Sequence, residues 1–438
     1  MKQITNSAGT DLLSASFISA SYDCYPHILL GILNNALANG WYPIPWKTAK
    51  ITIIQKPNKT NYELLENYRP ISVIPTFSKI FERIILSRLK WHAVEEKWFN
   101  EGQHGFREGY STESAIHYLV HHIESHFSKK EFTACAFIDI KSAFDSAWHP
   151  AILSALIFKK CPNYLVRIIK DYLSNRKALI NIDGHEFEAF IETGCPQGGI
   201  LSAFLWTILI DDVFNIRLPF PIFISAYADD LTIACRHTLP STATLRLNIA
   251  CKAVVDWLLS IKLLINPPKT IFMLFKFRQR DCSLPDGLFL NIQETVINPS
   301  TSTTVLGFQI NDQLNWKKHI ELKCISASRL LFAIRHCISL TWGLNRSRLQ
   351  YLYKLIVEPT ILYGCPVWVA RTSYKVVTKN LRSFQGKYAI LILRAFRTTQ
   401  TEHNINFSLS ASKFISKVLV NANLLMPYDR AKCICSIR

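Results

Sequence analysis

The stretch IFISAYADDLTIAC, Ile222 to Cys235, is apolar and rich in β-forming residues except at its centre, where Asp229 and Asp230 stand side by side. A charged pair between two such runs predicts a β-hairpin whose turn carries both carboxylates, since Asp is a favoured turn residue. For an isolated Asp-Asp pair, a plain turn is the commoner explanation. A functional interpretation therefore needs a third carboxylate in a similar setting elsewhere in the chain.

A third carboxylate of this kind is Asp139, near the end of a predicted strand from Ala134 to Ile140. Aspartates at the ends of separate strands can meet on adjacent strands of one sheet, and their oxygen atoms suit hard divalent cations. Such a site can hold two Mg²⁺ ions about 4 Å apart, which activate an attacking hydroxyl and stabilise the leaving oxygen in phosphoryl transfer. We therefore predict two Mg²⁺ ions, with Mn²⁺ as an acceptable substitute, held by Asp139, Ile140 through its main chain, Asp229 and Asp230, of which Asp139 and Asp229 are the shared ligands.

Helical and extended segments mix along the chain without a regular β-α-β repeat, which favours an α+β fold over a doubly wound sheet. Apolar residues at helical spacing predict helices at His27–Leu37, Thr76–Val94, Thr112–Phe127, about Pro150–Leu173, from Ile200 onward, and at about Thr242–Leu259. Further β structure is predicted as a strand at Ile51–Ile54 and a hairpin at Asp183-Gly184.

Four histidines in the predicted helix Thr112–Phe127 form two HxxxH pairs, His117 with His121 and His122 with His126. On a helical wheel the two pairs lie on opposite flanks of the apolar stripe, so they cannot converge on one metal ion. With only two ligands on each side, we interpret them as solvated flanks of the helix rather than as a zinc site.

Positive charge is concentrated in the last third of the chain. Residues 301–438 hold 20 Lys and Arg against 5 Asp and Glu, whereas residues 1–300 hold 30 against 27. Such a field suggests a polyanionic partner, with nucleic acid first and an anionic membrane surface second. Four cations recur at helical spacing beside an apolar stripe, which predicts a helix with one cationic face: Arg371, Lys375, Lys379 and Arg382.

The cysteines and the apolar runs bear on the cellular compartment. The 12 cysteines are scattered without paired CxxC motifs, and no signal peptide follows Met1, so we expect reduced thiols in an intracellular protein. The longest apolar run, Ile200 to Ile210, is much shorter than the roughly 18 residues that a membrane-spanning helix needs. No membrane partner is expected.

Beyond these carboxylates, the chain carries a series of motifs that resemble those of reverse transcriptases, in the same order and with similar spacing. FIDIKSAFD resembles motif A, GCPQGGILS motif B, YADD motif C, INPPKTIFMLF motif D and VLGFQINDQLNWKKHI motif E. KITIIQKPNK with NYRPISVIPTFSKIFERII resembles the fingers block, and GFREGYSTESA resembles the block after it. YKLIVEPTILYGCPVW is similar to the region after the palm in LINE-type, non-LTR retrotransposons of the jockey and I-element groups. The resemblance runs from about Trp41 to Trp368 and is specific, although YADD alone is a weak signal.

The resemblance implies a right-hand polymerase: an α+β fold with fingers, a palm made of an antiparallel sheet plus helices, and a mostly helical thumb. It implies an RNA-directed DNA polymerase that adds dNTPs to a primer 3′-hydroxyl on an RNA template. Asp139, Asp229 and Asp230 take the catalytic metal-binding roles, and Lys269 that of a proton donor to the pyrophosphate. Residues expected to contact the nucleotide are Arg69, Lys50, Lys56, Phe144, Gln197 and Gly198, while Arg371, Lys375, Lys379 and Arg382 would follow the phosphates of an RNA template and DNA primer.

Two of these positions have an ordinary interpretation as well. Without the resemblance, Phe144 would be taken as a core aromatic, whereas with it the ring is expected to exclude the 2′-hydroxyl of ribonucleotides. Lys56 is equally well explained as a surface cation. Ala203 stands where a Pro often follows in this family, a departure that could reshape the start of the helix but removes no functional group.

The resemblance divides the chain into an N-terminal helical extension (1–40), reverse transcriptase fingers and palm (41–310), and a basic thumb and C-terminal region (311–438). No endonuclease or RNase H domain is expected, and presence in the nucleus during integration would follow from the family. Two alternatives stay open: a catalytically inactive remnant that only binds nucleic acid, and a group II intron maturase. Nothing in the sequence identifies a protein partner.

Overall fold

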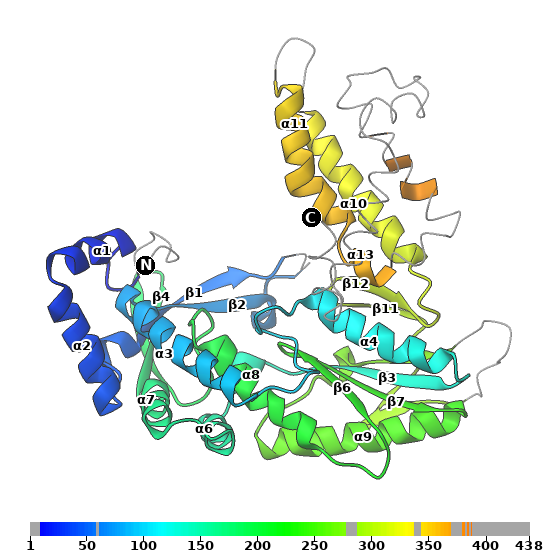
Figure 1. Ribbon diagram of the computed structural model, residues 1–438, viewed down its shortest axis with the longest axis horizontal. Coiled ribbons are helices and arrows are strands. Elements are labelled where there is room, and N and C mark those ends of the chain that lie inside the picture. The colour runs from blue at the N-terminus through cyan, green and yellow to red at the C-terminus, as the bar shows by residue number, and fades with distance from the viewer. Residues whose placement is uncertain are drawn as a thin grey trace, which may run out of the picture.

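The predicted hairpin around Asp229-Asp230 lies in a four-stranded antiparallel sheet, the central sheet of the computed structural model (Figure 1). Its strand order is β6 (Phe223–Tyr227), β7 (Asp230–His237), β3 (Phe132–Asp139) and β8 (Ile271–Phe275). The structure describes residues 9–57, 61–276, 287–336, 343–368, 379–381, 383–384 and 387. Because β3 lies between β7 and β8, this strand is the direct neighbour of two strands that come about 100 residues or more later in the sequence.

The two faces of the central sheet are covered by different helices. Ala134, Ala136 and Ile138 of β3 pack in one apolar cluster with α8 (Ser202–Asp211) and α9 (Pro240–Ser260). The alternate residues of β3, Cys135 and Phe137, pack in a second cluster with α4 (Thr112–Phe127). Since side chains alternate along a strand, Asp139 lies on the face covered by α4.

A second sheet, the side sheet, has the order β2 (Tyr68–Val73), β1 (Thr48–Gln55), β4 (Arg176–Ile182) and β5 (His185–Ile191). β1 pairs antiparallel with β2 and parallel with β4, and β4 and β5 form the hairpin predicted at Asp183-Gly184. The sheet therefore joins the segment before the central sheet with the segment that leads to α8.

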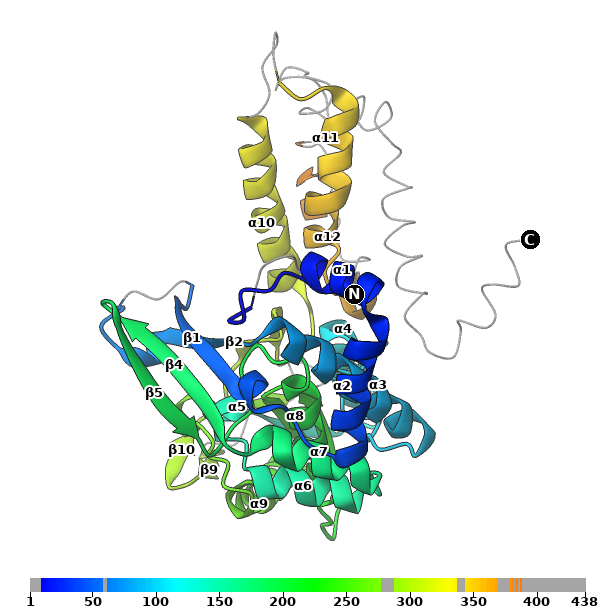
Figure 2. The same cartoon turned by 90° about the vertical axis from the view of Figure 1, so that its left-hand side faces the viewer.

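The N-terminal helices α1 (Ala15–Cys24) and α2 (Pro26–Asn39) lie beside α3 (Thr76–Glu95), as both views show (Figures 1 and 2). The predicted single helix at Pro150–Leu173 is wrong, because α6 (His149–Phe158) and α7 (Asn163–Leu173) are separate. Pro162 occupies the N-cap of α7, since proline fits the start of a helix but removes a hydrogen bond from its interior.

The C-terminal part of the described chain extends away from both sheets. Two hairpins follow, β9 (Leu290–Ile292) with β10 (Thr295–Ile297) and β11 (Ser302–Val305) with β12 (Phe308–Asn311). The long helix α10 (Lys317–Arg335) and the shorter helix α11 (Arg346–Leu352) then project from the body of the molecule (Figures 1 and 2). The shorter elements are α5 (Ala143–Ser146), α12 (Glu358–Ile361), α13 (Cys365–Trp368), the 3₁₀ turns Ile44–Lys47, Leu65–Asn67, Asp212–Asn215 and Pro267–Lys269, and the π turn Tyr353–Val357. Among the described residues between 317 and 368, helices predominate, as expected for this part of the chain.

The predicted cationic helix lies mainly outside the described residues. Arg371, Lys375 and Arg382 are among the positions that the structure does not describe, and Lys379 is exposed. In the described ranges, no helix is both long and apolar enough to span a lipid bilayer. The division of the chain at residues 40 and 310 stays a prediction.

The interpretation of the histidine pairs as solvated flanks is wrong for one pair. His126 is buried, and the ring of His122 stacks on Phe223 of β6 with centroids 4.3 Å apart. Burial, followed by repulsion from His126 and Arg236, lowers the pKa of His122 to about 3. In the described part of the chain, no three His, Cys, Asp or Glu side chains are grouped as a metal site.

His122 is expected to make the protein less stable in mild acid. Its folded pKa lies below the ordinary 6.5, so the unfolded state binds the proton first and stability falls as pH drops through 6.5. Between pH 7.5 and 5.5 the wild type should lose about 1.4 kcal/mol more than His122→Gln. Urea unfolding at both pH values measures this difference. His27→Gln, at an exposed site in α2, should keep the wild-type pH dependence, and equal pH dependence in His122→Gln and wild type would contradict this expectation.

Candidate active site

Three aspartates lie at one end of the central sheet, where β3 and β6 end and β7 begins. Asp230 opens β7 and pairs with Tyr227 of β6 on one side and with Asp139 of β3 on the other. Ala228 and Asp229 form the two-residue turn, with Ala228 in the left-handed conformation at φ 54°. The structure therefore confirms that the hairpin turn brings Asp229 and Asp230 beside Asp139.

The turn is held from behind by residues that the sequence analysis did not identify. The indole Nε1 of Trp206, a fully buried residue of α8, donates a hydrogen bond to the carbonyl of Ala228 at 2.8 Å. Gly105 lies so close to the turn that a Cβ there would stand 2.2 Å from the Ala228 nitrogen. These contacts fix a turn that has no glycine of its own. The two glycines of GQHGFR were the only sequence signal of a close approach.

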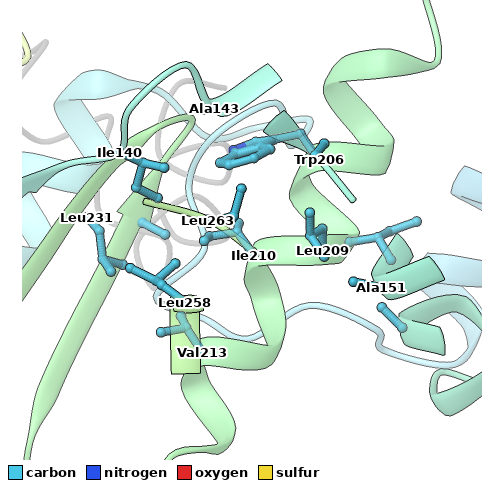
Figure 3. Packing of buried hydrophobic residues seen from close by; sticks show 14 of the residues in the cluster. Ile140, Ala143, Ala151, Trp206, Leu209, Ile210, Val213, Leu231, Leu258 and Leu263 are labelled. Atoms are coloured by element: carbon cyan, nitrogen blue, oxygen red, sulfur yellow. The ribbon is translucent and has the colours of Figure 1, made fainter. Parts of the chain in front are cut away.

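Figure 3 shows the apolar packing behind the site, where Ile140 and Leu231 of the sheet region lie near Leu258 and Leu263. All four side chains are buried. A close-packed interior resists displacement. This core therefore gives the strand ends that carry the carboxylates a rigid base.

The carboxylates repel one another. Burial, followed by the neighbouring Asp139 carboxylate, raises the pKa of Asp229, while the Arg69 and Lys269 cations oppose that rise. Desolvation by the surrounding protein, with repulsion from Asp229 and Asp139, raises the pKa of Asp230 to about 6, although the residue keeps contact with solvent. The negative charge at this end of the sheet is thus only partly compensated by the protein.

Lys269 lies beside the same carboxylates. Its Nζ is 3.5 Å from Oδ2 of Asp139, and its side chain is 65% exposed. The preceding loop is fixed to the end of β3, because the Asn266 nitrogen donates to the Asp139 carbonyl at 2.8 Å. The structure therefore brings the predicted motif D lysine to the site.

The donor atoms at this end of the sheet fit a hard divalent cation. They are carboxylate oxygens, which such ions prefer, and their mutual repulsion would be relieved by a cation between them. Within the described residues no three acidic, His or Cys side chains stand close enough together to form a metal site as they are placed. Ile140 directly follows Asp139 and bridges to Ile265, and its carbonyl stays a predicted ligand.

The predicted phosphate-binding cations come from the side sheet. Arg69 of β2 is exposed, and its charge acts on Asp229. Lys50 of β1 lies four positions from Ile54, the partner of Arg69, so it is on the same face of the sheet. The Lys56 ammonium acts on Asp145, whose pKa is raised by burial and lowered in part by that cation. The structure therefore groups Arg69 with the carboxylates and puts Lys50 farther along the same surface.

Phe144 is half-buried beside the site, in the short helix that follows β3. Its ring centroid is 5.7 Å from that of Trp206 and 6.0 Å from that of Phe106. The ring is therefore held between two aromatic neighbours, one of which also supports the hairpin turn. Its partial burial agrees with both interpretations of this residue, as a packed aromatic and as a wall of a nucleotide pocket.

The loop with Gln197 and Gly198 lies against β2. The Ser72 nitrogen donates to the Gln197 carbonyl at 2.7 Å, and a Cβ at Gly198 would stand 2.7 Å from the Ser72 carbonyl oxygen. Gly198 has φ 124°, which L side chains rarely adopt, so both space and conformation require glycine. The side-chain oxygen of Gln197 is buried and has no hydrogen-bond partner in the described part of the chain.

Comparison with known proteins agrees with this geometry. The family described as "Reverse transcriptase (RNA-dependent DNA polymerase)" matches residues 54–310, more than half of the chain. The chain therefore belongs to the reverse transcriptase family, whose members generally use divalent metal ions.

The individual proteins that this chain resembles are encoded by mobile elements. The chain is 30% identical to the RNA-directed DNA polymerase from mobile element jockey of Drosophila funebris, over 86% of this chain and 42% of that protein. It is 27% identical to the probable RNA-directed DNA polymerase from transposon BS of Drosophila melanogaster, over 79% of this chain and 39% of that protein. The chain thus spans about two fifths of the length of these relatives. The predicted resemblance to the reverse transcriptases of jockey-like, non-LTR elements is confirmed.

Among solved structures, the apo telomerase from Candida tropicalis matches with a TM-score of 0.48 and 13% sequence identity, over 91% of this chain and 68% of that one.

Proposed function

We propose that this chain is an RNA-directed DNA polymerase that adds dNTPs to the 3′-hydroxyl of a primer paired with an RNA template. The observation that carries the proposal is the end of the central sheet, where Asp139 pairs with Asp230 and Asp229 lies in the adjoining turn. Metal-assisted phosphoryl transfer uses clustered carboxylates with cations beside them. Here the positive charges of Arg69 and Lys269 act on the Asp229 carboxylate.

In this proposal Asp139, Asp229, Asp230 and the Ile140 carbonyl would hold two Mg²⁺ ions. When bound, the ions activate the primer hydroxyl and stabilise the leaving pyrophosphate. Asp139 and Asp229 would be the shared ligands, and Asp230 would assist. Trp206 and Gly105 hold the turn that contains Asp229. Its carboxylate is therefore kept in place, so little reorganisation is needed at the moment of reaction.

The surrounding residues then act on the nucleotide. Arg69, with Lys50 and Lys56, neutralises the triphosphate, and the side-chain amide of Gln197 orients the base or sugar. Phe144 closes the pocket below the sugar. Lys269, 3.5 Å from Asp139, donates a proton to the departing pyrophosphate.

The basic C-terminal region is proposed to bind the RNA template and DNA primer. Arg371, Lys375, Lys379 and Arg382 would contact phosphates, which gives sequence-independent and salt-sensitive affinity. For the integration of an element, the chain would act in the nucleus. Neither proposal depends on the geometry of the carboxylates.

Chelation of divalent metal is expected to stop primer extension completely, because the carboxylates alone cannot activate the primer hydroxyl. Extension of a labelled DNA primer on an RNA template is followed after addition of EDTA. Excess Mg²⁺ or Mn²⁺ added afterwards should restore it, and EDTA premixed with excess Mg²⁺ is the control. Extension that continues under chelation would contradict the metal site.

A further inference from the structure

Helix α8, which follows the Gln197 loop, begins without a cap from its own sequence. Leu201 is at the N-cap position and makes no side-chain hydrogen bond, and the first turn has no acidic residue. The first N–H groups of a helix have no partner within the helix and need one from elsewhere. A buried helix start of this kind must therefore be satisfied by another part of the chain.

Glu82 of α3 supplies that partner. Its Oε2 accepts hydrogen bonds from the nitrogen of Ile200 at 2.6 Å and of Leu201 at 3.1 Å, across 118 and 119 residues of sequence. Glu82 is fully buried. Hydrogen bonds to a charged acceptor are about twice as strong as neutral ones, so an ionised Glu82 holds the two residues that lead into α8.

The groups around Glu82 stabilise its negative charge although burial of the side chain disfavours the charged form. Burial raises the pKa of Glu82, while the Arg176 guanidinium and the two main-chain hydrogen bonds lower it. Arg176 is also fully buried, and Ser78 Oγ donates to Oε1 of Glu82 at 3.3 Å. A buried charge of this kind is weak evidence for stability and is better explained by the geometry that it imposes.

The Gln197 loop is held on its other side by β2. Ser72, whose nitrogen binds the Gln197 carbonyl at 2.7 Å, is three residues from Arg69 on the same strand. The loop is thus fixed at one end by the strand that carries Arg69 and at the other by Glu82. Loss of either tie would let Gln197 move relative to the carboxylates.

We propose that Glu82 is a positioning residue for nucleotide binding, which holds the Gln197 loop at the distance from the carboxylates that an incoming dNTP requires. This inference rests on the proposed polymerase function. Glu82 touches neither the nucleotide nor the metals and acts only through the main chain of Ile200 and Leu201.

Glu82→Ala is expected to raise the KM for dNTP about tenfold and to change kcat by less than about threefold, since the loop binds the nucleotide but performs no chemistry. Affinity for the template–primer duplex should stay unchanged. Glu82→Gln should recover most of the loss, because its amide oxygen can accept from the same two N–H groups. Tyr42→Phe is the matched control: it removes a hydroxyl 2.7 Å from Ser78 Oγ in the same buried cluster but leaves both loop contacts intact.

A second measurement needs no activity. Hydrogen exchange of the main-chain amides at residues 197–203 should be faster in Glu82→Ala than in wild type and Tyr42→Phe. The proposal is overturned if exchange there is unchanged, or if Glu82→Ala and Tyr42→Phe raise the KM equally. A wild type that extends no primer contradicts the proposed function instead, and exchange then still decides whether Glu82 holds the loop. Should Glu82→Ala fail to fold, Glu82→Met takes its place in both measurements, because Met fills a similar space but has no oxygen to accept the two hydrogen bonds.

Discussion

Replacing Asp229 with Asn is expected to lower the rate of dNTP addition by at least about 10³-fold, because it removes one of the two carboxylates that would share the metal ions. Asn has nearly the same size, and the Asp229 carboxyl lies in a turn that Trp206 and Gly105 hold through Ala228. The substitution also removes a negative charge from a group of mutually repelling carboxylates. The fold should therefore persist with unchanged or slightly higher thermal stability.

Single-turnover extension of a DNA primer on an RNA template measures this effect. Asp256→Asn, at an exposed position of α9, is the matched control and should keep the wild-type rate. Binding of the template–primer duplex, measured at low and moderate salt, should be equal in all three proteins. A loss of less than about tenfold in Asp229→Asn would remove Asp229 from the catalytic group.

Replacing Phe144 with Val is expected to reduce discrimination against ribonucleotides about 100-fold while dNTP incorporation falls only a few-fold. The ring is held between Trp206 and Phe106, so in the wild type it cannot easily move aside for a 2′-hydroxyl. Val shortens the side chain and leaves room for that hydroxyl. The cost in packing should be modest because Phe144 is only half-buried.

The ratio of kcat/KM for dGTP to that for GTP, measured opposite a template C, tests this prediction. Phe158→Val, at a residue that is 70% exposed in α6, is the control and should leave the ratio unchanged. If Phe144→Val kept the wild-type ratio and lost only stability, Phe144 would be an ordinary core aromatic.

Local patterns predicted much of the fold. The helix at Thr112–Phe127 has the predicted bounds because its apolar spacing is regular and Ser111 caps it. The hairpin of β6 and β7 was predicted because the Asp229-Asp230 pair interrupts an apolar run. Pro162 divides the predicted helix at Pro150–Leu173 into two. The prediction missed this break because it gave the apolar spacing more weight than the proline. His122 was misjudged because its burial depends on Phe223, a residue of another strand.

In the candidate site too, local motifs could be predicted, whereas contacts between distant residues could not. Asp139, Asp229, Asp230, Lys269 and Arg69 could be named from motifs, and the structure brings their charges together. Trp206 and Glu82 could not be named, because their significance lies in hydrogen bonds to distant main-chain atoms, 22 residues away for Trp206 and 118 and 119 residues away for Glu82. In sequence, Trp206 looks like any apolar-helix residue and Glu82 like any surface acid.

The decisive experiment for polymerase activity is extension of a DNA primer on an RNA template, with dNTPs and Mg²⁺ and the purified chain as the sole protein. We expect stepwise products whose sequence is complementary to the RNA. Omission of one dNTP should stop synthesis at the first template position that requires it. Absence of any product, under conditions in which the chain binds the same duplex tightly and a known reverse transcriptase extends it, would contradict the claim and leave a protein that only binds nucleic acid.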